Sequence, residues 1–306
     1  MAVTAVQRVG VTPRFAHLDR TSFHVDGRYN SAEEPEAHVI HMTRGSSRDQ
    51  RPDLNQVMLD WLVEHQAGIP LLMKPLRGTT SDAHDVGEVV TAPMAQRHTA
   101  YGASYLVADS ALDSAENLAK LAHTGSRWLT RVPATVSAAQ QALAQAAPAA
   151  MTPLRAGYRY QALASTSGGV AQRWRLIYAE HRRPQAQRAV DKQWLKQSTS
   201  EVKAFQKLCR TTFACAADAQ QALNTFAHSL RATAVLEVTV RATPRYRRRG
   251  RPAPGTFPAQ VVYQVEGALA SSIVARQALV AQQSCFILAT NELDDTQLPA
   301  QEVLEG

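Results

Sequence analysis

The sequence predicts an α/β protein with a separate basic segment, and three observations lead to this prediction. First, 45% of the 306 residues are apolar and 19% are charged, which is typical of globular proteins. Second, residues 104–133 follow a strand–helix–strand pattern. Third, most of the positive charge falls within residues 134–262. The length is enough for one large domain or two modest ones.

The N-terminal part of the chain is expected to form mainly strands. Residues 15–25 mix β-branched, aromatic and apolar side chains and end at Asp26-Gly27, a turn signal. Pro70 and Pro75 argue against a helix in the apolar stretch around them. The other elements expected here are strands at 37–44, 55–64 and 69–76 and a helix at 83–98. Periodicity alone leaves a helix open for residues 55–64.

A strand–helix–strand unit follows. Residues 104–109 form a short apolar run, Ser114 is expected to cap a helix at 115–123 that Gly125 ends, and residues 126–133 form the next strand. Asp109 therefore lies at the carboxyl end of the first strand. Because ligands bind at the carboxyl ends of strands in open α/β sheets, Asp109 is well placed for chemistry.

The basic segment mixes helices and strands. An Ala- and Gln-rich stretch at 136–147 predicts a helix, and residues 244–255 predict an Arg-rich loop because Pro and Gly interrupt them. The remaining predicted elements are strands at 159–165, 172–180, 234–240 and 284–290, helices at 185–208 and 216–231, and an acidic turn at 291–299.

The charge is unevenly distributed. Residues 1–133 carry 13 basic and 15 acidic side chains, residues 134–262 carry 19 and 5, and residues 263–306 carry 1 and 6. The middle segment thus has a formal charge of +14, whereas the whole chain has +7. This pattern favours a nucleic-acid-binding insertion, and a solvated basic surface without a partner is the alternative.

Several classes of protein do not fit the sequence. It contains no run of about 18 apolar residues, so no membrane span is expected, and the first ten residues lack the features of a signal peptide. Cys209, Cys215 and Cys285 cannot form a disulfide framework, and reduced thiols in a cytosolic protein are the simplest interpretation. The spacing of the first two is poor for zinc. Ser110 has no evident base partner, which argues against a serine hydrolase.

Two acids stand out because each lies on or at the end of a predicted strand. Asp19 and Asp109 are 90 residues apart in the chain. Carboxylates that converge from neighbouring strands suit Mg²⁺, which prefers oxygen ligands and retains waters. Such ions can activate a hydroxyl and stabilise a leaving oxygen in phosphoryl transfer. The alternative for each acid is a solvated residue at a strand end or turn.

A series of segments, in order and at familiar spacing, resembles the DDE transposases of bacterial insertion sequences. The similarity is greatest to the insertion-sequence-four superfamily, in the subgroup usually numbered sixteen thirty-four, and covers most of residues 8–305. The segments are HLDRTSFHVDGRYN, GSSRDQRPDLNQ, GIPL with GTTSD, LVADSALDSAENL, SRWLTRVPAT, RWRLIYAEHR, FACAADAQQAL, RGRP and FILATNELDD.

The resemblance implies an RNase H-like catalytic core interrupted by a basic insertion domain. The corresponding domains would be the first part of the core at 1–133, the insertion at 134–280 and the return strand of the core at 281–306. It also implies Mg²⁺- or Mn²⁺-dependent cleavage and joining of DNA at transposon ends, with Asp19 and Asp109 as the first two catalytic acids. A cytoplasmic, nucleoid-associated homodimer that binds transposon ends and target DNA is what the family implies.

The chain departs from the family at the third acid. The family's Glu follows the FILATN strand on a helix with a Tyr-Lys pair, whereas this sequence stops at QEVLEG. Glu302 and Glu305 precede the expected position, so neither is assigned the role. Only 18 residues precede Asp19. We therefore expect a transposase truncated at both ends that lacks a core helix, binds its metal weakly and is defective.

Two further expectations concern residues outside the acid pair. Asp82 lies in a family-like element in which Thr79 replaces the expected Asn, so a structural role is favoured for Asp82. The Arg-rich loop offers phosphate contacts through Arg245, Arg247, Arg248, Arg249 and Arg251. Because these contacts do not need the metal, the alternative function is a non-catalytic DNA-binding remnant or an inhibitor of transposition.

Overall fold

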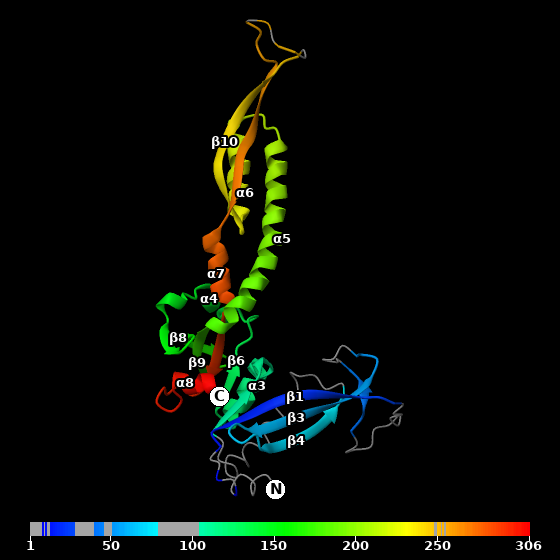
Figure 1. Cartoon of the computed structure of the whole chain (residues 1–306), viewed down its shortest axis with the longest axis vertical. Coiled ribbons are helices and arrows are strands. Elements are labelled where there is room, and N and C mark those ends of the chain that lie inside the picture. Colours follow the sequence, from blue (N-terminus) through cyan, green and yellow to red (C-terminus); the bar gives the residue numbers. More distant parts are fainter. Residues whose placement is uncertain are drawn as a thin grey trace. The chain divides into compact units, whose positions relative to one another are not determined.

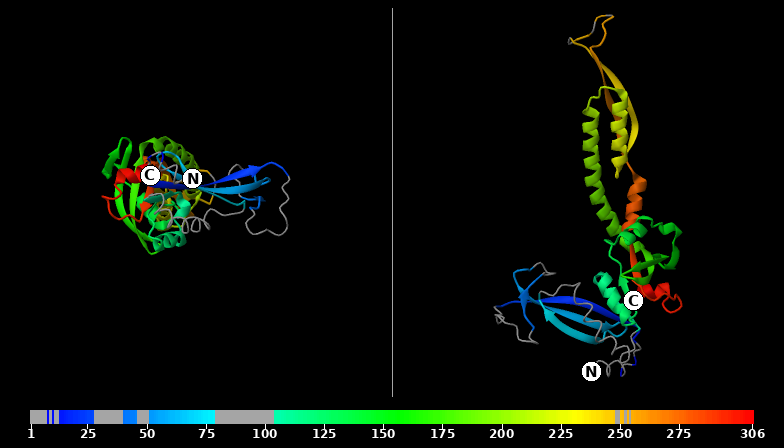
Figure 2. Two further views of the ribbon diagram at one scale, coloured as in Figure 1. Left: turned by 90° about the horizontal axis from the view of Figure 1, so that it is seen from below. Right: turned by 180° about the vertical axis from the view of Figure 1, so that it is seen from behind.

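The computed structural model describes residues 8, 10, 13–27, 40–45, 51–78, 104–247, 250–251, 253 and 255–306. The chain divides into two compact units. The first consists of Met1–Ala179 with Cys285–Gly306, and the second of Glu180–Ser284. Figure 1 colours the chain along its sequence, and Figure 2 adds two views.

The first unit is built on one large mixed sheet. Its strands are β1 (Phe15–Val25), β2 (Thr43–Arg44), β3 (Asn55–Glu64), β4 (Pro70–Arg77), β5 (Tyr105–Ala108), β6 (Trp128–Arg131), β7 (Thr152–Arg155), β8 (Tyr158–Ser167), β9 (Val170–Ala179) and β12 (Cys285–Thr290). The order is β2-β3-β1-β5-β6-β12-β9-β8-β7. β4 also pairs with β3, along residues 57–63, whereas β2 pairs with residues 55–56. The helices are α3 (Ala115–His123), α4 (Ser137–Ala144) and α8 (Ala300–Glu305), with short 3-10 turns at Ser110–Leu112 and Pro148–Ala150.

The pairing of the first strands follows from their side-chain patterns. β3 alternates buried and half-buried residues along its whole length, which settles its open assignment as a strand. β1 and β3 pair antiparallel, and β3 pairs antiparallel with β4. By contrast, β5 pairs parallel with β1 and with β6. The two kinds of pairing meet at β1.

The connection from β5 to β6 is the predicted helical crossover. Ser114 caps α3, since its hydroxyl accepts a hydrogen bond from the backbone N–H of Asn117 at 3.2 Å. Gly125 ends the helix with a φ of +66°, a conformation that favours glycine. Leu118 and Leu121 of α3 are fully buried against the sheet. The local signals in the sequence were therefore sufficient for this unit.

Each face of the sheet carries its own core. The larger cluster joins α3 and α4 to the sheet through residues such as Leu106, Trp128 and Trp174. The smaller cluster, on the other face, contains Phe15, Tyr105, Leu129, Leu298 and Val303. The last two of these belong to the C-terminal segment, which covers the second face.

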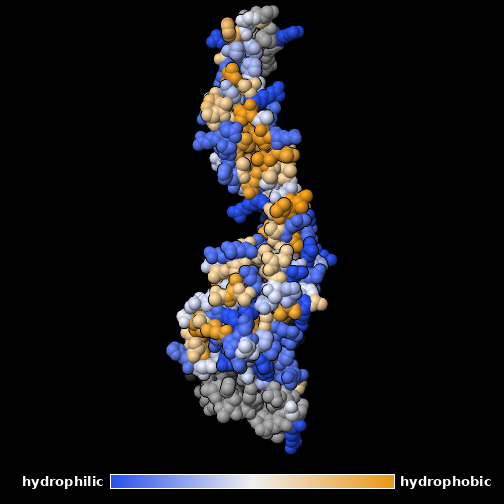
Figure 3. Space-filling model, turned by 90° about the vertical axis from the view of Figure 1, so that its left-hand side faces the viewer, coloured by the Kyte–Doolittle hydropathy of each residue, from blue (hydrophilic) through white to orange (hydrophobic). Residues whose placement is uncertain are grey.

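The second unit combines helices with a two-stranded antiparallel hairpin. Its elements are α5 (Arg183–Arg210), α6 (Ala216–Ser229), β10 (Thr233–Arg245), β11 (Gln260–Ser271) and α7 (Ile273–Gln283), after a 3-10 turn at Glu180–Arg182. Phe205, Leu223 and Val265 join α5, α6 and the hairpin in one core. Val190, Trp194 and Val280 join α5 to α7 in another. Figure 3 shows apolar surface on this unit. Leu236 of β10 and Ile273 and Val274 of α7 are exposed.

The mixed α/β class is confirmed, and several element predictions need correction. The strand expected at 37–44 is reduced to Thr43–Arg44 among the described residues, and the helix expected at 83–98 lies outside them. The predicted strand at 234–240 continues to Arg245, because it pairs with β11, which the sequence reading had not anticipated. The helix α7 was also not anticipated.

The two compact units differ in their boundaries from the domains that the family resemblance implies. Residues 134–179 had been assigned to the insertion at 134–280, but they lie in the first unit, where β9 pairs with β12 and continues the sheet. Counting charge cannot separate them, because this stretch contributes four arginines to the basic segment. Of the helices in the described ranges, none has the length and apolar character needed to cross a membrane.

Candidate active site and nucleic-acid interface

The two predicted acids lie on neighbouring parallel strands. Asp19 is in the middle of β1, and Asp109 immediately follows the last residue of β5. The pairing of the two strands runs from Phe15 opposite Tyr105 to Leu18 opposite Ala108. Extended by one residue, the same register brings Asp19 opposite Asp109. Opposing residues on neighbouring strands are generally about 4.8 Å apart, so the two carboxylates can share one ligand.

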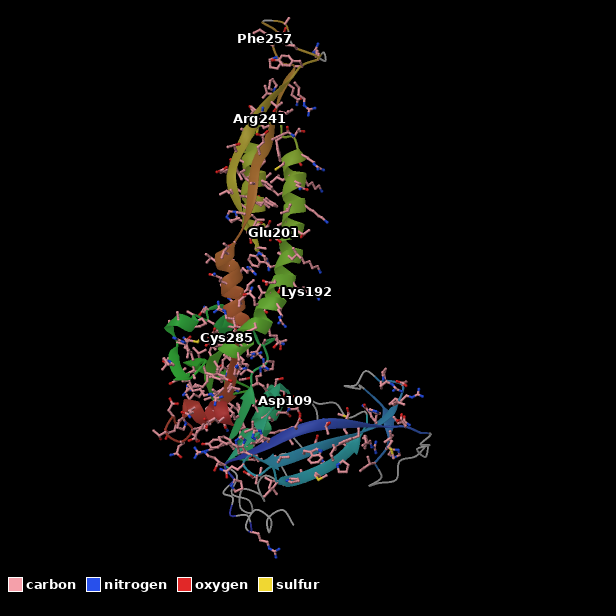
Figure 4. The ribbon with its side chains drawn as sticks, viewed as in Figure 1. Asp109, Lys192, Glu201, Arg241, Phe257 and Cys285 are labelled. Carbon is pink, nitrogen blue, oxygen red and sulfur yellow. The ribbon has the colours of Figure 1, made fainter. Side chains whose placement is uncertain are left out.

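Both acids are exposed. Side chains alternate along a strand, so Asp19 of β1 shares the second face of the sheet with Phe15. Asp109 directly follows the last residue of β5. The carbonyl of Asp109 accepts a hydrogen bond from the hydroxyl of Thr130 at 2.7 Å, which ties the end of β5 to β6. Figure 4 labels Asp109 beside β1 and α3.

Asp19 is held on its strand by the residue that follows it. The backbone N–H of Arg20 donates to Oδ1 of Asp19 at 2.9 Å. The Arg20 side chain lies on the opposite face, where its Nε and Nη2 donate to the two carboxylate oxygens of Asp60 at 2.5 and 2.9 Å. Arg20 and Asp60 are 7% and 2% exposed, so this is a buried bidentate ion pair. It fixes the segment of β1 that carries Asp19 against β3.

Arg131, at the end of β6, was not among the residues predicted from the sequence. Ala108 of β5 is paired with Thr130 of β6, so one further step brings Asp109 opposite Arg131. Arg131 is exposed, and its guanidinium lies 5.8 Å from the centre of the Phe286 ring. A signal was available in the sequence, because Arg131 is the last residue of β6 and Asp109 directly follows β5. Ligands bind at the carboxyl ends of such strands.

The same face carries a buried polar network beneath the C-terminal segment. Arg173 and Arg175 of β9 both pair with Asp295, and Nη2 of Arg173 also donates to the carbonyl of Leu298 at 2.6 Å. Burial lowers the pKa of Arg173, although Asp295 acts in the opposite direction. Residues 291–299, predicted as an acidic turn, are therefore anchored to the sheet by arginines.

Two other groups near the acids have perturbed pKa values. Burial raises the pKa of Asp113 to about 6, and its Oδ1 has no hydrogen-bond partner among the described residues. Burial also raises the pKa of Tyr105, whose hydroxyl donates to Glu292 at 3.3 Å. Asp113 follows Asp109 by four residues in the segment that contributed to the family resemblance.

Neither C-terminal glutamate had been assigned a role, and both form other contacts. Glu302 pairs with Arg14 at 2.6 Å, and Glu305 accepts a hydrogen bond from Gln301 at 3.0 Å. Within the described ranges, no group of three or more His, Cys, Asp and Glu could hold a metal ion. Asp82 and Thr79 lie outside those ranges.

The carboxylate oxygens of Asp19 and Asp109 are the type of ligand atom that Mg²⁺ prefers. Two carboxylates supply hard oxygen ligands, and Mg²⁺ readily completes its octahedron with water or substrate oxygens. Asp19 and Asp109 are the residues that would hold the ion.

The arginine cluster lies at the tip of the hairpin in the second unit. Arg245 ends β10, and Arg247 and Arg251 are in the connecting segment; all three are exposed. Arg248 and Arg249 lie outside the described residues. Phe257, also at this tip, is 91% exposed, and Figure 4 labels it there. The sequence reading had not singled out Phe257, and exposed aromatic rings are a common means of stacking on bases.

Comparisons with known proteins show a partial likeness to solved structures. No family model matches the chain, and no curated protein matches it. A solved structure described as "Mos1 transposase paired-end complex with left transposon end" is similar over part of its length, with 12% sequence identity and a TM-score of 0.25. The match spans 42% of this chain and 38% of that chain.

Proposed function

We propose that the chain is a transposase of the DDE type, with an RNase H-like core that performs metal-dependent phosphoryl transfer on DNA. The observation that carries the proposal is the parallel register of β1 and β5, which ends with Leu18 opposite Ala108, the residues directly before Asp19 and Asp109. Adjacent exposed carboxylates on parallel strands are the minimum arrangement for a shared divalent ion.

The strand order gives independent support. β4, β3 and β1 form an antiparallel meander, and β5 and β6 then continue the sheet in parallel with a helical crossover between them. This combination agrees with the RNase H-like core implied by the sequence resemblance. In such a core the first acid lies within the central strand and the second follows the neighbouring strand, as Asp19 and Asp109 do.

The roles of the residues follow from their positions. Asp19 and Asp109 would hold Mg²⁺ or Mn²⁺, which when bound supplies Lewis-acid activation of a hydroxyl and stabilises the leaving oxygen. Thr130 fixes the end of β5, and the Arg20–Asp60 pair fixes β1, so both carboxylates are positioned before the ion binds. Arg131 can contact a phosphate of the DNA strand at the acids. Two carboxylates leave most of the coordination to water, so we expect weak metal binding and slow turnover.

Metal-directed backbone cleavage tests the site without requiring turnover. Fe²⁺ bound in place of Mg²⁺ generates hydroxyl radicals with peroxide and ascorbate, which cut the nearby chain. We expect cuts close to residues 19 and 109 that excess Mg²⁺ suppresses and that Asp19→Asn or Asp109→Asn removes. Asp53→Asn, at an exposed ion pair with Arg51, is the matched control in the first unit. Cuts elsewhere only, or cuts that persist in both variants, would rule out the acid pair as the metal site.

A second candidate function is DNA binding without catalysis, either as a remnant or as an inhibitor that occupies transposon ends. The basic composition of the second unit favours it, since residues 180–284 carry 16 Lys and Arg against 6 Asp and Glu. The arginines at 245, 247, 248, 249 and 251 would contact phosphates. Sequence-specific footprints on transposon ends, together with a negative Fe²⁺ result, would favour this function over the first.

A further inference from the structure

The long helix of the second unit carries a row of basic side chains. The members of this row, the α5 stripe, are Arg188, Lys192, Lys196, Lys203, Lys207 and Arg210. At 100° per residue, all six fall within an arc of about 100° around the helix axis. Each of them is exposed. The sequence signal was the recurrence of Lys and Arg at intervals of three, four and seven residues.

The stripe lies opposite the buried side of the helix. Val190, Trp194, Glu201 and Phe205 are buried, and they point toward α7, α6 and the hairpin. Figure 4 shows Lys192 on the outer side of α5, away from Glu201. The stripe is therefore an exposed surface of the second unit that takes no part in the unit's core.

No acid of the helix neutralises the stripe. Between Arg183 and Arg210 the acids are Asp191 and Glu201. Asp191 pairs with Arg276 of α7 at 2.5 Å, and the hydrogen bond from Arg276 lowers the pKa of Asp191. Glu201 accepts hydrogen bonds from the start of β10. None of the six stripe residues forms a salt bridge with a residue that the structure describes.

We infer that the α5 stripe binds the phosphate backbone of double-stranded DNA. From Arg188 to Arg210 the helix rises by about 33 Å, at 1.5 Å per residue. This length is close to one turn of B-DNA, roughly 34 Å. The stripe contains no acid, so its flexible cations can each approach a phosphate. Neutral polar residues such as Thr199 and Gln206 lie between them. The inference rests on the proposed function only in taking DNA as the partner.

The stripe would contribute affinity rather than sequence preference. Lys and Arg on an outer helix surface contact phosphates, which fix the position of the protein on the duplex without reading bases. Binding should therefore be similar for unrelated sequences and should weaken as salt rises. Base contacts, if any, would come from elsewhere in the chain, for example the tip with Phe257.

The test measures the salt dependence of DNA binding by the full chain. A fluorescent 30-base-pair duplex of arbitrary sequence is titrated at several NaCl concentrations, with Lys192, Lys196, Lys203 and Lys207 all changed to Gln. Each lost phosphate contact should reduce the slope of log affinity against log salt by about 0.9, so we expect a reduction of about 2 to 4. Changing the same four residues to Arg should preserve the slope.

A matched control removes four cations elsewhere, by Arg51→Gln, Lys74→Gln, Lys120→Gln and Arg155→Gln in the first unit. It should leave the slope unchanged, and circular dichroism checks that each variant folds. An unchanged slope in the α5 variant, while the wild type still binds the duplex, would overturn this inference alone. Absence of duplex binding by the wild type would overturn it together with the DNA partner in the proposed function. Loss of binding to anionic vesicles but not to DNA would assign the stripe to a membrane surface instead.

Discussion

At the scale of single residues, Glu201 links the long helix of the second unit to its hairpin. Its carboxylate accepts hydrogen bonds from the backbone N–H groups of Arg231 at 2.9 Å and Thr233 at 2.8 Å, and from the Thr233 hydroxyl at 2.6 Å. Burial by itself would raise the pKa of Glu201, but these hydrogen bonds and one from Gln197 outweigh it and lower the pKa to about 2.

This pKa gives a prediction with a definite sign. Because the folded pKa is about 2 and the ordinary value is 4.5, the ionised form stabilises the fold above pH 4.5. That contribution is lost as the pH falls from 4.5 toward 2. Glu201→Gln should lower the free energy of unfolding by about 2 kcal/mol at pH 7, and the difference from wild type should shrink below pH 4.5. Urea denaturation at pH 7 and pH 3 measures this, with exposed Glu266→Gln as the control.

At the scale of elements, the hairpin of β1 and β3 depends on one buried ion pair. Arg20 and Asp60 oppose each other in the register and are almost fully buried. Asp60→Asn replaces the carboxylate of this buried pair by a neutral amide, so we expect a loss of about 3–5 kcal/mol in stability. The exposed pair of Arg51 and Asp53 is the control, and Asp53→Asn should leave the urea midpoint unchanged. Equal midpoints for the two variants would contradict the prediction.

The elements differ in how far the sequence could predict them. The unit around α3 has local signals for each boundary, including the cap at Ser114 and the glycine at 125, and it formed as expected. β11 was not predicted, because it is defined by its antiparallel pairing with β10. α7 was not predicted either, although Ser272 caps it as Ser114 caps α3. For the acid pair, the residues could be named from the sequence, but their common register could not. Arg131 and the α5 stripe could be predicted only by working out which residues share one face of a strand or of a helix.

At the scale of the whole molecule, the insertion point of the second unit is unusually simple. β9 and β12 are neighbouring antiparallel strands, and Cys285 pairs with Tyr178. The chain therefore leaves the first unit at Ala179 and returns at the opposing position in the sheet. Topologically, residues 180–284 occupy the place of a hairpin turn. The first unit has its own cores on both faces of its sheet, and among the residues that the structure describes these cores contain none from 180–284.

It follows that the second unit can be removed without unfolding the first. Replacing residues 180–284 by a short Asn-Gly turn should join β9 to β12 as a hairpin, because such turns match the twist of antiparallel strands. We expect a cooperatively unfolding protein that keeps Fe²⁺-directed cuts near residues 19 and 109. Its affinity for duplex DNA should fall, because the removed unit carries a formal charge of +10. The control is the same shortened chain with Asp109→Asn. It should fold equally well but lose the Fe²⁺-directed cuts, so it separates folding from metal binding. Failure of the shortened chain to fold cooperatively would show that the two units depend on each other for stability.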